Sequence, residues 1–193
     1  MPSAPRIRVI GVDPGSHITG YGLIEREGNR LIHVDNGCLV APTKALIEDR
    51  LFFIFEGLVK VLKEFKPHVM ALEEAFYAKS VASTLRLGEA RGIILLAARS
   101  HDIPVTQYAT RSVKQAVTAY GQATKEQVQE MTRRLLNLRE VAQEDASDAL
   151  ALAICHAHGS TLSALSPSAK KSPSRSKKTR WSEADLLTLR KKS

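Results

Sequence analysis

The chain has 193 residues, 44% of them hydrophobic, which is typical of one globular domain with a well-buried core. Its longest apolar runs are far shorter than the roughly 20 residues that cross a membrane, and its N-terminus has no signal-peptide core, so we expect a cytoplasmic protein. The formal charge of +8 lies mostly in residues 159–193, which hold 9 of the 28 lysines and arginines and 2 of the 20 acids and so carry +7. The remainder carries only +1, which excludes a body that is basic throughout.

Three successive strands are predicted near the N-terminus. Residues 7–13 form an apolar run, residues 19–24 alternate in polarity, and residues 31–41 have the composition of a third strand. The short connections between them predict an antiparallel meander.

Asp13 ends the first of these strands. Pro14 favours extended backbone before it, and Gly15 permits the turn that follows. Side-chain alternation places Asp13 on the same face as Gly11, so we expect open space there for a substrate or an ion. An aspartate before Pro-Gly also commonly caps a turn, so Asp13 alone does not identify a site.

Helices and strands alternate along the rest of the chain. Residues 43–65 predict an amphipathic helix that covers one sheet face, and residues 69–74 predict a fourth strand that again ends in acids. The remaining elements are expected as a helix at 82–100, a short strand at 104–108, and helices at 111–120, from 124 onward and at 145–158. This order predicts an α/β fold, in which an antiparallel three-strand meander is followed by parallel strands in one mixed sheet flanked by helices.

Four carboxylates are candidates for one site, and a sheet of this kind binds its ligands beyond the carboxyl ends of its parallel strands. Asp13 and Glu73 end strands, whereas Asp145 and Asp148 lie three residues apart at the start of the last helix, where neighbours are about 5–6 Å apart. Clustered carboxylates repel one another unless a cation is present, and oxygen ligands without His or Cys favour Mg²⁺ or Mn²⁺. Two such ions about 3.5–4 Å apart would support phosphodiester hydrolysis. An acidic first helical turn is equally well explained by the helix dipole.

Five segments of the chain carry a family resemblance. They are residues 11–15 (GVDPG), 72–80 (LEEAFYAKS), 87–92 (LGEARG), 113–115 (VKQ) and 145–151 (DASDALA). Together, over about residues 7–158, they resemble the RuvC family of bacterial Holliday-junction resolvases. The resemblance implies an RNase H-like fold, a homodimer, and symmetric metal-dependent nicking of four-way DNA junctions in recombination and repair. It also implies RuvA and RuvB, the branch-migration proteins, as partners.

The resemblance assigns roles by motif position. It makes four acids the catalytic metal ligands, with two Mg²⁺ ions that Mn²⁺ can replace: Asp13, Glu73, Asp145 and Asp148. It places Lys114 and Lys125 near the active site and DNA, and it favours stacking of Phe76 on bases. By residue type alone, a single lysine usually lies on a solvated face and an aromatic side chain is usually buried. Lys125 is more informative, because a cation in a first helical turn opposes the dipole unless a phosphate binds there.

Two glycines four residues apart, Gly88 and Gly92, lie within the helix predicted at residues 82–100. Each costs up to about 1 kcal/mol relative to alanine in a helix, so we expect them to permit close packing of another element. The same helix of a second subunit is one such element, and an isologous dimer would present one active site to each of two opposed strands.

Two other classes of function are weighed against a nuclease. A phosphotransferase of the actin and sugar-kinase type also holds an aspartate and glycines in its first hairpin, but it needs a second domain that this length does not supply. A non-enzymatic DNA-binding module would use the basic tail, but it leaves the placement of the acids unexplained.

The sequence predicts two regions. Residues 1–158 form the RNase H-like nuclease domain, and residues 159–193 form a disordered basic tail rich in Ser, Pro, Lys and Arg. Within the tail, Ser182 and Asp185 give a capping pattern before three leucines, so a short helix could form there on a partner.

Overall fold

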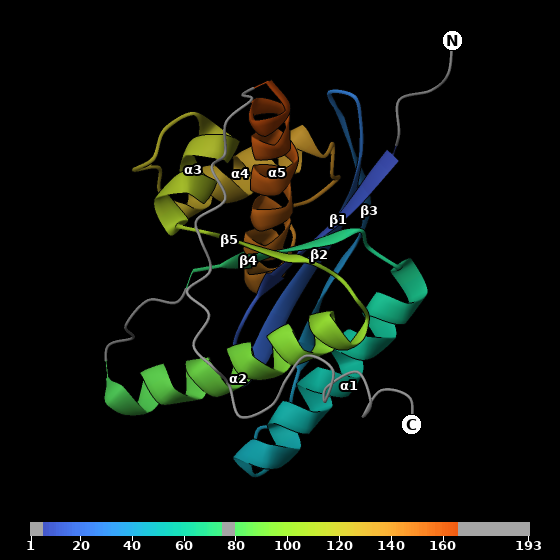
Figure 1. Ribbon diagram of the computed structural model, residues 1–193. Helices are drawn as coiled ribbons and strands as arrows, with labels where there is room; N and C mark the ends of the chain where they lie inside the picture. The colour runs from blue at the N-terminus through green and yellow to red at the C-terminus, as the bar shows by residue number, and fades with distance from the viewer. Residues whose placement is uncertain (1–5, 75–79, 166–193) are drawn as a thin grey trace, which may run out of the picture.

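The computed structural model describes residues 6–74 and 80–165 and shows one five-stranded sheet (Figure 1). The strands follow in the spatial order β3-β2-β1-β4-β5. Their bounds are β1 (Arg6–Asp13), β2 (Ile18–Glu27), β3 (Arg30–Val40), β4 (Val69–Glu73) and β5 (Val105–Tyr108). The first three strands pair antiparallel, and β4 and β5 join on the other side of β1 in parallel. The predicted mixed sheet is therefore confirmed.

Helices cover both faces of the sheet, so the molecule has three layers (Figure 1). Helices α1 (Ile47–Phe65) and α2 (Val81–Ser100) lie on one face, and α3 (Thr110–Thr118), α4 (Lys125–Leu135) and α5 (Glu144–Leu165) lie on the other. Alternation along β1 explains this arrangement, because Ile10 packs in the core under α1 and α2 whereas Val9 packs in the core under α5. No helix in the described part of the chain is both long and apolar enough to span a membrane.

Two helix ends differ from the sequence prediction by more than two residues. Helix α1 begins at Ile47 rather than at residue 43, because the chain first makes a turn in which Ala45 N–H donates to the Pro42 carbonyl at 3.1 Å. Helix α5 continues to Leu165, seven residues beyond its predicted end at residue 158. The rest of the predicted basic tail, including its capping pattern, lies outside the described residues from residue 166 onward.

The space above Gly11, which we expected to be open, is filled by helix α5. A Cβ added at Gly11 would lie 1.8 Å from the Ala149 carbonyl oxygen, and one added at Gly20 would lie 2.0 Å from the Asp145 carbonyl oxygen. Glycine in β1 and β2 therefore lets the α5 backbone approach the sheet much more closely than any side chain would permit. This contact places the start of α5 directly beside the carboxyl end of β1.

Candidate active site

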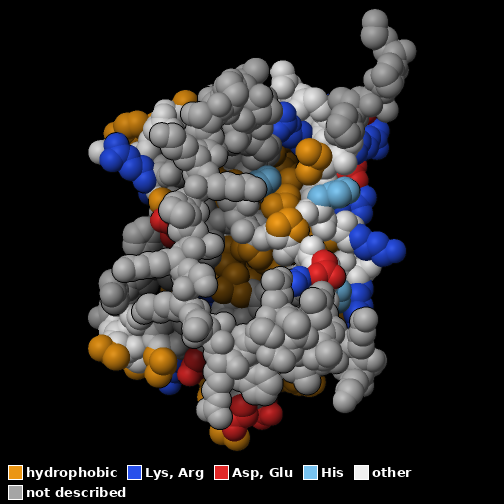
Figure 2. All heavy atoms as spheres, viewed as in Figure 1, with side chains coloured by type: hydrophobic (Ala, Val, Ile, Leu, Met, Phe, Trp, Pro, Cys, Tyr) orange, Lys and Arg blue, Asp and Glu red, His pale blue; other side chains and the backbone are white. Residues whose placement is uncertain are grey.

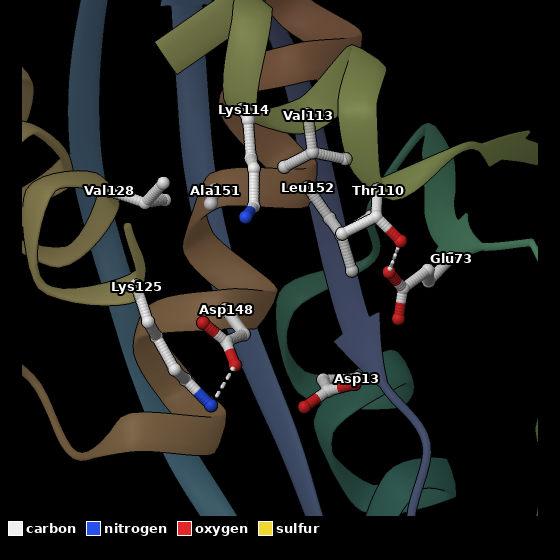
Figure 3. Close-up of a pocket in the computed structure, with 10 residues that line it drawn as sticks. All are labelled: Asp13, Glu73, Thr110, Val113, Lys114, Lys125, Val128, Asp148, Ala151 and Leu152. Atoms are coloured by element: carbon white, nitrogen blue, oxygen red, sulfur yellow. Dashed lines mark hydrogen bonds and ion pairs between the residues drawn. The ribbon is translucent and has the colours of Figure 1, made fainter. Parts of the chain in front are cut away.

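A pocket of about 270 Å³ opens where β1 and β4 end, between the sheet and helices α3, α4 and α5 (Figure 3). Acids, lysines and an apolar wall line it: Asp13, Glu73, Thr110, Val113, Lys114, Lys125, Val128, Asp148, Ala151 and Leu152. The carboxyl ends of parallel strands are the expected ligand-binding edge of an open α/β sheet. Three of the four predicted acids and both predicted lysines thus meet in one pocket.

Asp13 carries the strongest sign of an unbalanced acidic cluster. The pKa of Asp13 is raised from its ordinary 3.8 to about 7, first by burial and then by the nearby charges of Asp148, Glu73 and Asp145. Lys125 acts in the opposite direction but does not outweigh them. A carboxylate held this way gains from any cation that enters the pocket, because the cation relieves both repulsion and desolvation.

Glu73 is held at the end of β4 by two neighbouring elements. Thr110 Oγ1, at the start of α3, donates a hydrogen bond to Glu73 Oε1 at 2.5 Å (Figure 3). The Arg91 guanidinium of α2 donates to the backbone carbonyl of Glu73. The strand end and the carboxylate are therefore each anchored separately.

Lys125 forms ion pairs with two acids of α5. Its Nζ lies 3.0 Å from Asp148 Oδ2 and also contacts Glu144, which precedes Asp148 by one helical turn. Burial lowers the pKa of Lys125, but the hydrogen bonds to Glu144 and Asp148 outweigh this and raise it. Burial raises the pKa of Asp148 even though Lys125 opposes the rise. Lys125 is thus fully charged and neutralises only part of the acidic cluster.

A capping box at the start of α4 sets the position of Lys125. Thr124 Oγ1 accepts a hydrogen bond from Gln127 N–H at 3.3 Å, and Gln127 Oε1 accepts one from Thr124 N–H at 2.9 Å. This reciprocal pair fixes the start of α4, so that Lys125 is its first residue. Lys114 reaches the same pocket from α3 (Figure 3).

The remaining predicted site residues are placed less centrally. Asp145 lies in the first turn of α5 and raises the pKa of Asp13, but it is not among the residues that line the pocket. Phe76 lies outside the described residues. At Gly88 and Gly92 an added Cβ would meet no described atom within 4 Å, so no described element of the same chain packs against them.

Sequence reasoning misses two residues at this site, Thr110 and Glu144. Glu144 stands four residues before Asp148 on one helix, and this spacing is a usable signal because it places both acids on the same face. Thr110 gives no such signal, because its hydrogen bond to Glu73 depends on the pairing of β4 with β5.

The donor set fits a divalent cation that prefers oxygen. Asp13, Glu73 and Asp148 offer carboxylate oxygens, which are the ligands of Mg²⁺ and Mn²⁺. Within residues 6–74 and 80–165, no three carboxylate, imidazole or thiol groups converge closely enough to hold an ion as they stand. Asp148 is instead paired with Lys125, whose Nζ lies 3.0 Å from its Oδ2.

The raised pKa of Asp13 predicts a stability profile in metal-free buffer. Between about pH 4 and 7 the folded chain retains a proton that the unfolded chain has lost, so the free energy of unfolding falls as pH rises through this range. Asp13→Asn removes the titrating carboxyl and with it this decrease in stability. The free energy of unfolding should therefore rise by on the order of 2–4 kcal/mol at pH 8 and change little at pH 4. Urea unfolding in EDTA at pH 4 and pH 8 measures the difference in free energy of unfolding between Asp13→Asn and wild type. An equal difference at the two pH values would contradict a raised pKa of Asp13.

Comparison with known proteins identifies relatives over nearly the whole described chain. The family profile described as "Crossover junction endodeoxyribonuclease RuvC" matches residues 9–156. The protein of that name from Syntrophotalea carbinolica is 55% identical over 152 residues, which cover 79% of this chain and 94% of the relative. The one from Geobacter sulfurreducens is 51% identical over 82% of this chain and 97% of the relative.

Solved structures give the same result. Thermus thermophilus RuvC in complex with a Holliday junction substrate superposes with a TM-score of 0.77 at 30% identity, covering 81% of this chain and 96% of that one. The yeast mitochondrial Holliday junction resolvase Ydc2 shares the fold, with a TM-score of 0.57 at 16% identity. The RNase H-like fold implied by the sequence resemblance is thereby confirmed. On sequence and structure together, this chain belongs to the RuvC family of crossover junction endodeoxyribonucleases.

Proposed function

We propose that this protein is a structure-selective endonuclease that resolves four-way DNA junctions by symmetric, divalent-metal-dependent phosphodiester hydrolysis during recombination and repair. The observation that carries the proposal is the meeting of Asp13, Glu73 and Asp148, from three separate elements, in one pocket with two lysines. The names of the relatives and of the junction complex support the same substrate.

Three acids of the pocket, Asp13, Glu73 and Asp148, are proposed to hold Mg²⁺, with Mn²⁺ as a substitute. Asp145 is proposed as the fourth acid, since it lies one turn from Asp148 and its charge raises the pKa of Asp13. When bound, two such ions supply activation of water and stabilisation of the leaving oxygen. The carboxylates contribute fixed negative charge at that point, and the partial burial of Asp13 strengthens its attraction for a cation.

The lysines are proposed to bind the backbone of the DNA. Lys125 stands at the positive end of the α4 dipole, where a phosphate is favoured, and Lys114 extends into the pocket from the facing helix (Figure 3). A cation held by Asp148 would compete with the ion pair between Asp148 and Lys125, so that Lys125, still paired with Glu144, would have a donor for a phosphate oxygen. Phe76, which follows β4 in sequence, is proposed to stack on an unpaired base.

Helix α2 supports a proposed homodimer. Its exposed face carries Gly88 and Gly92 together with the exposed apolar side chains of Val81, Leu85 and Leu96. Hydrophobic side chains are visible on the surface over the N-terminal part of α2, at the lower left of Figure 2. An apolar stripe with two glycines would let a second copy of the same helix approach closely. From family resemblance alone, RuvA and RuvB are proposed as further partners.

Replacing Gly92 with a bulky residue is expected to weaken this dimer. Gly92→Trp places an indole in the centre of the stripe and should raise the dimer dissociation constant by about 100-fold or more, while the fold is kept because an added Cβ meets no described atom. Sedimentation equilibrium measures the constant, and Lys60→Trp on the exposed surface of α1 is the matched control. A wild-type chain that remains monomeric at tens of micromolar would contradict the proposal.

Three assays run side by side separate this function from its rivals. Cleavage of a labelled junction in Mg²⁺, junction binding in EDTA, and ATP hydrolysis are measured on one preparation. A nuclease cleaves the junction and leaves ATP intact. Binding without cleavage in either Mg²⁺ or Mn²⁺ would favour a DNA-binding module, and ATP hydrolysis without cleavage would favour a phosphotransferase.

A further inference from the structure

Thr110 stands in the pocket although it belongs to none of the five sequence segments that carry the family resemblance. It is the first residue of α3, directly after the connection from β5. Its hydroxyl donates to Glu73 Oε1 at 2.5 Å, and the other carboxylate oxygen of Glu73 points toward the side of the pocket where Asp13 lies (Figure 3). This hydrogen bond therefore distinguishes the two oxygens of Glu73.

The backbone around Thr110 holds its hydroxyl in a defined position. Glu73 and Tyr108 are register partners at the ends of β4 and β5, and Glu74 N–H donates to the Tyr108 carbonyl at 2.9 Å. At the start of α3, Ser112 N–H donates to the Ala109 carbonyl at 2.8 Å and closes the first turn of the helix. Sheet pairing and helix start together leave Thr110 little freedom relative to Glu73.

Helix capping does not explain the threonine. The N-cap of α3 is Ala109, which makes no side-chain cap, and the Thr110 hydroxyl is directed at a carboxylate rather than at the helix backbone. A hydroxyl that donates to one carboxylate oxygen fixes the side-chain rotamer and leaves the second oxygen oriented for another partner.

We propose that Thr110 is a positioning residue for Glu73, which it orients so that the carboxylate presents one oxygen to a divalent cation in the pocket. This inference rests on the proposed function, since it assumes that Glu73 is a metal ligand. Partners of this kind typically change metal affinity or activity by about 10- to 100-fold when they are removed. In this role Thr110 acts through its hydrogen bond to Glu73.

The test measures Mn²⁺ binding to metal-free protein by isothermal titration calorimetry, without DNA. Thr110→Val keeps the shape of the side chain but removes the hydroxyl, and it is expected to raise the Mn²⁺ dissociation constant by about 10-fold or more. Thr110→Ser keeps the hydroxyl and should remain within about threefold of wild type. Thr132→Val is the matched control, because the Thr132 hydroxyl is buried on α4 and has no hydrogen-bond partner in the described structure.

Each outcome decides one point. Equal Mn²⁺ affinity of wild type and Thr110→Val would overturn the positioning role while leaving the proposed function intact. An equal loss in Thr110→Ser would overturn it too, because the hydroxyl would not be the cause. Failure of the wild type itself to bind Mn²⁺ would overturn the proposed metal site and this inference with it. Thermal unfolding of each variant in EDTA should show melting temperatures close to that of wild type, so that the change in affinity is not a consequence of unfolding.

Discussion

Asp13→Asn is expected to abolish junction cleavage while junction binding is retained. The substitution keeps the size of the side chain but removes a negative charge at the centre of the acidic cluster, so the cleavage rate in Mg²⁺ should fall at least about 1000-fold, equivalent to about 4 kcal/mol of transition-state stabilisation. Junction affinity in EDTA should stay within about threefold of wild type, because the lysines are unchanged. Single-turnover cleavage and gel-shift titration measure the two quantities.

Matched variants sharpen this prediction. Asp49→Asn removes an exposed carboxylate from α1, on the opposite face of the sheet, and should cleave at the wild-type rate. Glu73→Gln and Asp148→Asn should behave like Asp13→Asn, and Asp145→Asn tests the fourth proposed acid, for which we expect a loss in the same direction. Wild-type cleavage by Asp13→Asn in Mg²⁺ would show that the proposed chemistry is wrong.

Gly11→Ala is expected to be the most destabilising small substitution in the sheet. The added Cβ would lie 1.8 Å from the Ala149 carbonyl oxygen, so α5 must move away from β1. Overpacking of backbone against backbone should cost about 3 kcal/mol or more, which lowers the melting temperature of a chain of this size by roughly 6–12 °C. Cleavage should fall as well, because Asp148 moves with α5.

Calorimetry of two variants tests this packing. Gly159→Ala is the control, because it lies on α5 and its added Cβ meets no described atom within 4 Å. We expect Gly159→Ala to melt within about 2 °C of wild type, or slightly above it because alanine favours helix. The structure shows the α5 backbone in close contact with Gly11. Similar melting temperatures for the two variants would contradict that contact.

The layers of the fold could be predicted from the sequence because hydrophobic periodicity and turn residues are local signals. Strand ends at Asp13 and Glu73 can be located by the same reasoning, and the carboxyl edge of a parallel sheet then predicts that the two acids meet. The capping box at Thr124 is also a local pattern, and it is sufficient to place Lys125 in the first turn of α4.

Features that depend on how close two elements lie could not be predicted. Alternation along β1 predicts space for a ligand beside Gly11, whereas the space is taken by a helix backbone, and the pattern of one strand cannot distinguish the two. The partnership of Thr110 with Glu73 depends on the register between β4 and β5, which no local pattern specifies. Asp145 does not line the pocket, and this too depends on the exact rotation of α5 against the sheet, which no local pattern specifies.

If the acids of the pocket make this chain a metal-dependent resolvase, its cleavage must be both symmetric and dependent on a divalent cation. Both properties are measured at once with a four-way junction labelled in turn on each of its four strands and incubated with the full chain in Mg²⁺ or in EDTA. We expect nicks at symmetry-related positions on one pair of opposed strands in Mg²⁺, none in EDTA, and none on linear duplex. Cleavage that persists in EDTA, or a tightly bound junction left uncut in both Mg²⁺ and Mn²⁺, would contradict the proposed function.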